Sequence, residues 1–128
     1  MNYINFNANP KNRKTGDCVI RAISLALNKS WADTYREMTE HCIPKGYMLN
    51  YKDGYKSYLK KLGYEMLKMP KRFDNTRYTV KEFADELAEE NSIYILSIAN
   101  HVTVIKNKDL YDIWDCSKKS VGNYWKIK

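Results

Sequence analysis

Glutamine is absent from the 128-residue chain, and its three cysteines include no Cys-x-x-Cys pair. An odd number of cysteines without paired spacing argues against a disulfide scaffold and predicts reduced thiols. No apolar run reaches the length of a membrane span. The segment Met1 to Phe6 has neither the basic start nor the apolar core of a signal peptide. We therefore expect a cytoplasmic protein without a membrane partner.

The composition is that of one globular domain over residues 1–128, with 44% apolar residues and a net charge of +7. A basic surface attracts nucleic acid, but the lysines are dispersed along this chain. The densest group, from Lys56 to Lys71, contains no aromatic-glycine signature of an RNA-binding sheet. We interpret the charge as a solvated, lysine-rich surface and keep nucleic-acid binding as a weaker alternative.

Helical patterns precede strand patterns along the chain. A serine or threonine with an acidic residue three positions later marks two helix starts, at Ser30 and Thr79. From residue 92 onward, β-branched and aromatic runs alternate with short turns. This order predicts an α+β fold with an antiparallel meander after the helices. The expected helices span 17–27, 31–42, 52–62 and 79–90, and the expected strands span 64–67, 92–98, 101–106, 110–115 and 120–127.

Cys18 opens the apolar run from Val19 to Leu27, which has helical length and no helix breaker. A thiol at a helix N-terminus faces unpaired backbone N–H groups and the positive end of the helix dipole, and both favour the thiolate. We therefore predict a nucleophilic Cys18, with a buried core thiol as the alternative. Asp17 is expected to cap the helix or favour its dipole. Arg21, one turn after Cys18 on the same face, either supports the site or pairs with a carboxylate.

A nucleophilic cysteine needs a nearby base, and the chain has two histidines, His41 and His101. His101 begins an expected strand, and a three-residue turn over 107–109 places it directly opposite Asp115. In this register Asp112 lies on the other face of the hairpin, and a slip of one residue turns one partner to the other face. We predict the pair His101–Asp115, with a satisfied histidine at a strand end as the alternative.

The segments Asn12 to Leu27 and His101 to Trp125 resemble the papain-like cysteine peptidases, and among them the small bacteriocin-processing C39-like domains. The likeness consists of a thiol at the start of a buried helix, then a histidine at a strand start, then an asparagine or aspartate on the next strand. Short uncharacterised proteins of low-GC bacteria and their phages are also similar, through Thr15 to Ala22, His101 to Val104 and Trp114-Asp115.

The resemblance implies a papain-like fold with Cys18 as nucleophile, His101 as general base and Asp115 as the residue that orients the base. It also implies an oxyanion donor about six positions before the nucleophile, where the family has glutamine and this chain has Asn12. Asn12 is expected to polarise the carbonyl together with the backbone N–H of Cys18, from a shorter side chain. Trp114 is expected in the core or in the wall of the cleft.

The expected reaction is thiol-based acyl transfer, most simply hydrolysis of a peptide, isopeptide or amide bond in a peptide or protein substrate of a host or its phage. No cofactor is expected. The histidines and cysteines are numerous enough for a zinc site, but no pair has metal-ligand spacing, so no metal is expected. A second hypothesis is a phage-encoded binding protein that uses the same scaffold to capture a host protein or an anionic nucleotide in the bacterial cytoplasm.

Overall fold

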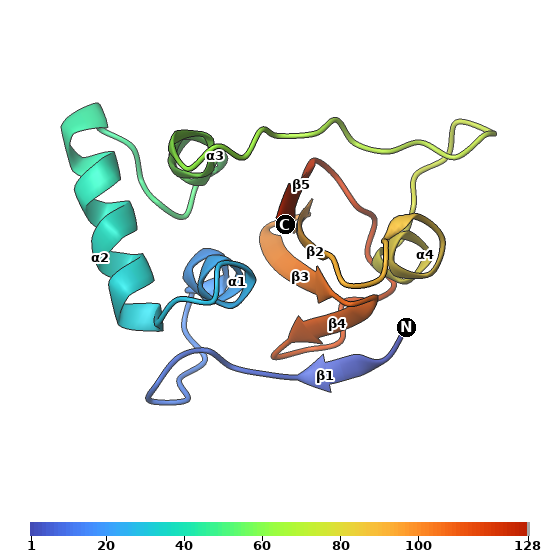
Figure 1. Cartoon of the computed structure of the whole chain (residues 1–128), viewed down its shortest axis with the longest axis horizontal. Coiled ribbons are helices and arrows are strands. Elements are labelled where there is room, and N and C mark those ends of the chain that lie inside the picture. Colours follow the sequence, from blue (N-terminus) through green and yellow to red (C-terminus); the bar gives the residue numbers. More distant parts are fainter. Residues whose placement is uncertain (128) are drawn as a thin grey trace.

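The computed structural model describes residues 1–127, which form a five-stranded sheet with helices on both faces. Figure 1 shows α1, α2 and α3 on one side of the sheet and the short α4 on the other. The elements are β1 (Tyr3–Asn5), α1 (Cys18–Ala26), α2 (Trp31–Cys42), η1 (Ile43–Lys45), α3 (Lys52–Lys61), α4 (Val80–Glu82), η2 (Phe83–Leu87), β2 (Ile93–Ile98), β3 (His101–Lys106), β4 (Asp109–Asp112) and β5 (Tyr124–Ile127). This combination confirms the expected α+β class.

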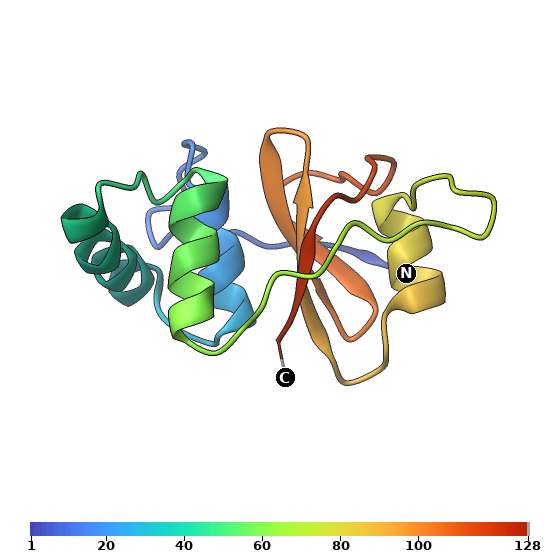
Figure 2. The ribbon, with the colours of Figure 1, turned by 90° about the horizontal axis from the view of Figure 1, so that it is seen from above.

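Helix α1 is the central helix that its apolar run predicts. Side chains around most of its circumference are buried, and the helix packs against β3 (Figure 2). Val19 and Ile23 belong to a core that also contains Ile95 of β2 and Trp125 of β5. Asn28 has a left-handed backbone with φ 54°, which ends the helix. The packing of α1 on β3 brings the helix against the strand that begins at His101.

Helix α2 lies outside α1 and begins at the expected cap. The hydroxyl of Ser30 accepts a hydrogen bond from the N–H of Asp33 at 3.0 Å. The buried residues of α2 are Thr34, Met38 and Cys42. Trp31, Tyr35 and Met38 recur at the spacing of an apolar helical stripe, but Tyr35 is exposed. The aromatic ring instead packs edge-on against Trp31 at the surface, with ring centroids 5.3 Å apart.

Gly54 lets helix α3 approach the loop that precedes it. A Cβ at Gly54 would lie 2.2 Å from the carbonyl oxygen of Met48. After α3, the chain passes beside β5 on its way to α4 (Figure 1). The strand predicted over 64–67 is reduced to a single bridge between Leu67 and Tyr124.

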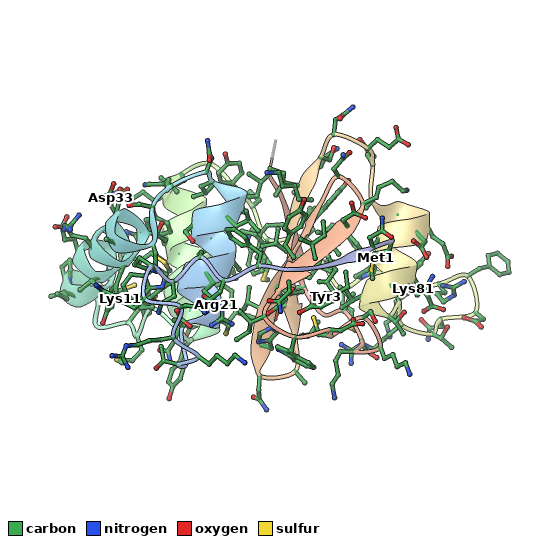
Figure 3. The ribbon with its side chains drawn as sticks, turned by 90° about the horizontal axis from the view of Figure 1, so that it is seen from below. Met1, Tyr3, Lys11, Arg21, Asp33 and Lys81 are labelled. Atoms are coloured by element: carbon green, nitrogen blue, oxygen red, sulfur yellow. The ribbon has the colours of Figure 1, made fainter. Side chains whose placement is uncertain are left out.

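The helical segment after Thr79 is shorter than predicted. Its capping box is present: the Thr79 hydroxyl accepts from the N–H of Glu82 at 3.1 Å, and the Glu82 carboxylate accepts from the N–H of Thr79 at 2.9 Å. The backbone then widens into a π-helical turn and ends at Leu87 instead of residue 90. Figure 3 shows Met1 beside this segment, where its ammonium pairs with Asp85 at 2.8 Å.

The sheet has the order β1-β4-β3-β2-β5 and is mixed, not purely antiparallel. The expected antiparallel meander is present in β2, β3 and β4, while β1 adds a parallel edge strand with Tyr3 opposite Leu110. Strand β4 ends at Asp112 and β5 begins at Tyr124, so both are shorter than predicted. No helix of the described residues is long and apolar enough to cross a membrane.

The turn between β3 and β4 is one residue shorter than the sequence predicts. Lys106 pairs with Asp109, so that only Asn107 and Lys108 form the turn. Their φ values of 53° and 67° are the left-handed angles that a two-residue hairpin requires. Because side chains alternate between faces, this slip of one residue changes which carboxylate shares a face with His101.

Candidate active site

Cys18 is the first residue of α1 and is partly exposed. Asp17 occupies the N-cap position, yet its side chain makes no capping hydrogen bond, which leaves the first N–H groups without that acceptor. Burial raises the pKa of the Cys18 thiol. Hydrogen bonds from His101 and from the N–H of Val102, together with the positive charges of His101 and Arg21, outweigh burial and hold this pKa below its ordinary value.

His101 is the first residue of β3, and its Nε2 lies 2.6 Å from Oδ2 of Asp112. Burial alone lowers the pKa of His101, but the hydrogen bonds to Asp112 and Cys18 outweigh burial and raise it to about 9. Burial raises the pKa of Asp112. Hydrogen bonds from His101, Thr103 and the N–H of Ile113 outweigh this and hold the pKa of Asp112 below its ordinary value. At neutral pH the pair is therefore an imidazolium and a carboxylate.

The imidazole connects the carboxylate to the thiol. Its Nε2 donates to Asp112, which leaves Nδ1 for the hydrogen bond with Cys18. The pKa of Cys18 is lowered while that of His101 is raised, because a proton moved from sulfur to imidazole gives two opposite charges in hydrogen-bond contact. The positive charge of the imidazolium therefore favours the thiolate of Cys18, which is the nucleophilic form of cysteine.

The predicted pair of His101 and Asp115 is wrong. Asp115 is exposed, and its Oδ1 accepts a hydrogen bond from the N–H of Ser117 at 3.0 Å. Continuing the observed register beyond β4 sets Thr103 opposite Asp112. Asp112 is then a diagonal neighbour of His101 on the same face. Asp112, which the predicted register placed on the other face of the hairpin, is therefore the carboxylate that holds His101.

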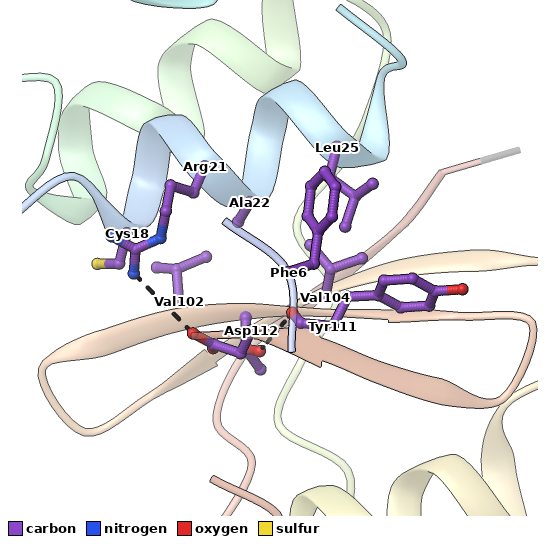
Figure 4. A pocket seen from close by; sticks show the side chains of 10 residues that line it. Phe6, Cys18, Arg21, Ala22, Leu25, Val102, Val104, Tyr111 and Asp112 are labelled. Atoms are coloured by element: carbon purple, nitrogen blue, oxygen red, sulfur yellow. Dashed lines mark hydrogen bonds and ion pairs between the residues drawn. The ribbon is translucent and has the colours of Figure 1, made fainter. Parts of the chain in front are cut away.

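Asp17 and Arg21 form a buried ion-pair network behind the dyad. The Arg21 guanidinium pairs with Asp17, and its Nη2 lies 3.9 Å from Oδ1 of Asp112. Figure 4 shows Arg21 reaching from α1 toward Asp112. The indole N–H of Trp31 and the amide of Asn9 also donate to Asp17, at 2.9 and 3.2 Å. Arg21 therefore pairs with a carboxylate, as one of its two expected roles requires, and its support of the site stays a prediction.

Asn12 does not approach the thiol. It is exposed, its backbone is left-handed with φ 52°, and its Oδ1 accepts a hydrogen bond from the amide of Asn7 at 3.4 Å. It is not among the residues that border the cleft beside Cys18. The first turn of α1 offers backbone N–H groups beside Cys18 that could serve an oxyanion in place of Asn12.

Trp114 covers the imidazole. The two ring centroids are 5.2 Å apart, and the indole nitrogen lies 3.2 Å from Nε2 of His101. Because the proton on Nε2 is donated to Asp112 at the shorter distance of 2.6 Å, we interpret the Trp114 contact as packing. Trp114 is 40% exposed and limits access of water to the imidazole, whereas Trp125 is fully buried in the core.

An open cleft of about 530 Å³ borders the dyad, within the size range of small-molecule sites. Its walls come from the loop before α1, the start of α3 and the turn between β2 and β3. The lining residues are Gly16, Cys18, Val19, Asn50, Tyr51, Lys52, Tyr55, Ser97, Ile98, Asn100, His101 and Val102. Sequence reasoning missed the contribution of α3, because the middle of the chain carries no motif.

The residues counted for zinc are not brought together as one set. Cys42 is buried in α2, and the Nε2 of His41 lies 2.8 Å from the hydroxyl of Ser57. His101, Asp112 and Cys116 do cluster, with their ligand atoms within 4.8 Å of one another. Two of these atoms are a hydrogen-bonded pair, and burial raises the pKa of Cys116 to about 12, so this group is arranged to hold a proton.

The turn at Asn107-Lys108 decides whether Asp112 or Asp115 lies beside His101, and it is the one feature of the sequence that could have identified Asp112. Asn107-Lys108 forms a two-residue turn only if a lysine adopts a left-handed backbone, for which Asn-Gly is the usual signal. Lys108 does so while its Nζ donates to the carbonyl of Ala88 at 2.9 Å.

Comparison of the chain with models of protein families, with curated proteins and with solved structures finds no match.

Proposed function

We propose that the protein is a thiol-dependent hydrolase or acyl transferase that acts on a peptide, isopeptide or amide bond. The observation that carries the proposal is the connected set Cys18–His101–Asp112. A partly exposed thiol at a helix start borders the same cleft as an imidazole that lowers its pKa, and that imidazole lies 2.6 Å from a buried carboxylate. A nucleophile, its base and an orienting group are the parts that covalent acyl transfer needs.

In the proposed reaction, the Cys18 thiolate attacks the substrate carbonyl carbon, and the carbonyl π electrons move to oxygen. Backbone N–H groups at the start of α1 stabilise the oxyanion. The His101 imidazolium donates its proton to the leaving amine as the C–N bond breaks, which leaves a thioester on Cys18. Neutral His101 then takes a proton from the second nucleophile, which is water in hydrolysis or the acyl acceptor in transfer. This nucleophile attacks the thioester carbonyl, and the C–S bond breaks to release the Cys18 thiolate. Asp112 keeps the imidazole oriented throughout.

The resemblance to papain-like peptidases supports this proposal. Cys18, His101 and Asp112 follow the family's order along the chain, with the thiol on a helix that packs on the sheet carrying the other two. The chain departs from the family at the oxyanion side chain, since Asn12 lies away from the cleft. In our proposal the backbone N–H groups take over that role. The substrate is a peptide or protein of a bacterial host or its phage, met in the bacterial cytoplasm.

A binding function for the same scaffold is the second candidate. The observation that favours it is charge: the net charge is +7, and Lys52 lines the cleft. An anionic nucleotide would fit such a surface. Under this alternative the thiolate forms no covalent intermediate, which separates the two candidates experimentally.

Trapping of an acyl intermediate tests the proposal. The native protein is mixed with p-nitrophenyl acetate at pH 7, quenched in acid and mapped by mass spectrometry. We expect an acetyl thioester on Cys18 and a burst of p-nitrophenol. Cys18→Ser should abolish the burst, and Cys42→Ser should leave it unchanged because Cys42 is buried in α2. A protein that forms no Cys18 thioester, with this ester or with a panel of peptide thioesters, is a binder and not an acyl transferase.

A further inference from the structure

Lys52 is a charged side chain in the wall of the cleft that the proposed chemistry does not use. It is the first residue of α3, is exposed, and borders the same cavity as Cys18 and His101. The other lining residues include no aspartate or glutamate. Within the described chain, the only charged groups of this cleft are therefore Lys52 and the dyad itself.

The ammonium group of Lys52 is positioned without being neutralised. Its Nζ donates to Oδ1 of Asn123 at 3.0 Å, and the Asn123 amide donates to the carbonyl of Leu67 at 3.3 Å. Among the ion pairs of residues 1–127, none involves Lys52. An ammonium group has three donors, so at least two remain for a ligand. A neutral amide thus directs the side chain while the full positive charge stays in place.

We propose that Lys52 forms an anion subsite, and that the preferred acyl substrate carries a carboxylate close to its scissile carbonyl. This inference rests on the proposed acyl-transfer function and names the substrate class for that site. Because the thiolate and the imidazolium of the dyad carry opposite charges, the ammonium of Lys52 gives the cleft a net positive charge, which attracts anions and repels cations. Acidic residues beside the scissile bond supply such a carboxylate in a peptide substrate.

Two alkylating agents of nearly equal size test the subsite directly. Iodoacetate carries a carboxylate next to the reacting carbon, and iodoacetamide carries a neutral amide there. With both, the Cys18 thiolate forms an S–C bond and iodide leaves, so the comparison needs no substrate. The quantity to measure is the ratio of the two alkylation rates at Cys18, at pH 7 and low salt.

We expect Lys52→Met to lower the iodoacetate-to-iodoacetamide ratio about two- to fivefold, the range of an exposed charge pair. Asn123→Asp provides a second variant, because a carboxylate at 123 would neutralise the ammonium while Lys52 remains. Lys56→Met is the matched control: it removes the same charge one turn later on α3, at an exposed position outside the cleft. Its ratio should equal that of the wild type.

Added salt should reduce the wild-type ratio toward that of Lys52→Met, because exposed charges are screened. A ratio that is the same in wild type and Lys52→Met, or that falls equally in Lys56→Met, overturns the subsite. Failure of the proposed function has a different signature. In that case no acetyl thioester forms on Cys18 with p-nitrophenyl acetate, whatever the ratio between the two alkylating agents.

Discussion

Cys18 and Cys116 lie at the two ends of the same histidine–aspartate pair, yet the pKa of one thiol is lowered and that of the other is raised. Cys18 is hydrogen-bonded to the His101 imidazole, and its sulfur meets positive charge. Cys116 is buried with its Sγ 3.8 Å from Oδ2 of Asp112, and burial followed by this negative charge raises its pKa to about 12. The sign of the neighbouring charge therefore decides which thiol has the lowered pKa.

The largest expected effect comes from Arg21, which supplies positive charge on the Cys18 side and faces both buried carboxylates. Arg21→Met leaves Asp17 and Asp112 buried without this partner, which should cost about 3–5 kcal/mol of unfolding free energy. Urea unfolding measures this loss. Arg36→Met is the control, because Arg36 makes an exposed pair with Asp33 and should cost less than about 1 kcal/mol. Equal losses in the two variants would contradict the buried network.

Removal of the imidazole should erase the difference between the two thiols. His101→Ala takes away the hydrogen bond and the positive charge that lower the pKa of Cys18, so it should slow iodoacetamide labelling of Cys18 at pH 6 by more than about tenfold. Peptide mapping of the adducts gives the rates at each cysteine. His41→Ala is the matched control, since His41 contacts Ser57 away from the site. Unchanged labelling in His101→Ala would mean that the helix terminus alone activates Cys18.

Asp112→Asn should shift the two thiols in opposite directions. The pKa of His101 falls without its carboxylate partner, so labelling of Cys18 at pH 6 should slow by about tenfold, the equivalent of one pKa unit. Cys116 loses the negative charge that helps to raise its pKa, so its labelling at pH 9 should become faster. Asp115→Asn serves as the control, because Asp115 contacts only its own turn in the described chain. The same direction of change at both thiols would argue against this account.

The pH dependence of stability separates the histidine from the thiol. In Cys18→Ser, Asp112 still raises the pKa of folded His101 above the unfolded value of about 6.5. The stabilisation from His101 is then fully present below pH 6.5 and is lost as the pH rises through the folded pKa. In the wild type, Cys18 has the opposite effect over this pH interval. Because its folded pKa is lowered, its contribution to stability increases as the pH rises toward the pKa of the unfolded thiol.

Unfolding by urea at pH 6 and pH 9 measures this difference. We expect Cys18→Ser to lose more stability than the wild type between these two pH values. The double variant Cys18→Ser with His101→Ala is the control and should lose less than Cys18→Ser alone. Identical pH profiles for the wild type and Cys18→Ser would show that the thiolate and imidazolium are not coupled.

The sequence predicts those parts of the molecule that depend on local patterns. The sequence correctly predicts the helix after Cys18, the helix caps at Ser30 and Thr79 and the strands around His101, because capping and periodicity act over a few residues. The α+β class follows from their order. The parallel edge strand β1 escapes prediction because Tyr3 pairs with Leu110, a partner more than a hundred positions away.

The site was harder to predict than the fold because it depends on register. A single lysine in a left-handed turn moves the carboxylate beside His101 from residue 115 to Asp112. The proximity of Cys18 to His101 arises from packing of α1 on β3, which no spacing in the sequence encodes. Arg21 could be placed on the Cys18 face by helical periodicity, but its two carboxylate partners come from different elements.

Asn12 gives the smallest expected effect and tests the resemblance most directly. The family pattern makes the side chain six positions before the nucleophile an oxyanion donor, whereas Asn12 is exposed and contacts Asn7. Asn12→Ala should therefore change the rate of Cys18 acetylation by less than about twofold, while loss of a true oxyanion donor costs about 100-fold or more. Ala8→Ser is a control for changes in the same loop. If Asn12→Ala slows acetylation by tenfold, the loop closes over the substrate, and the backbone N–H groups of α1 do not act alone.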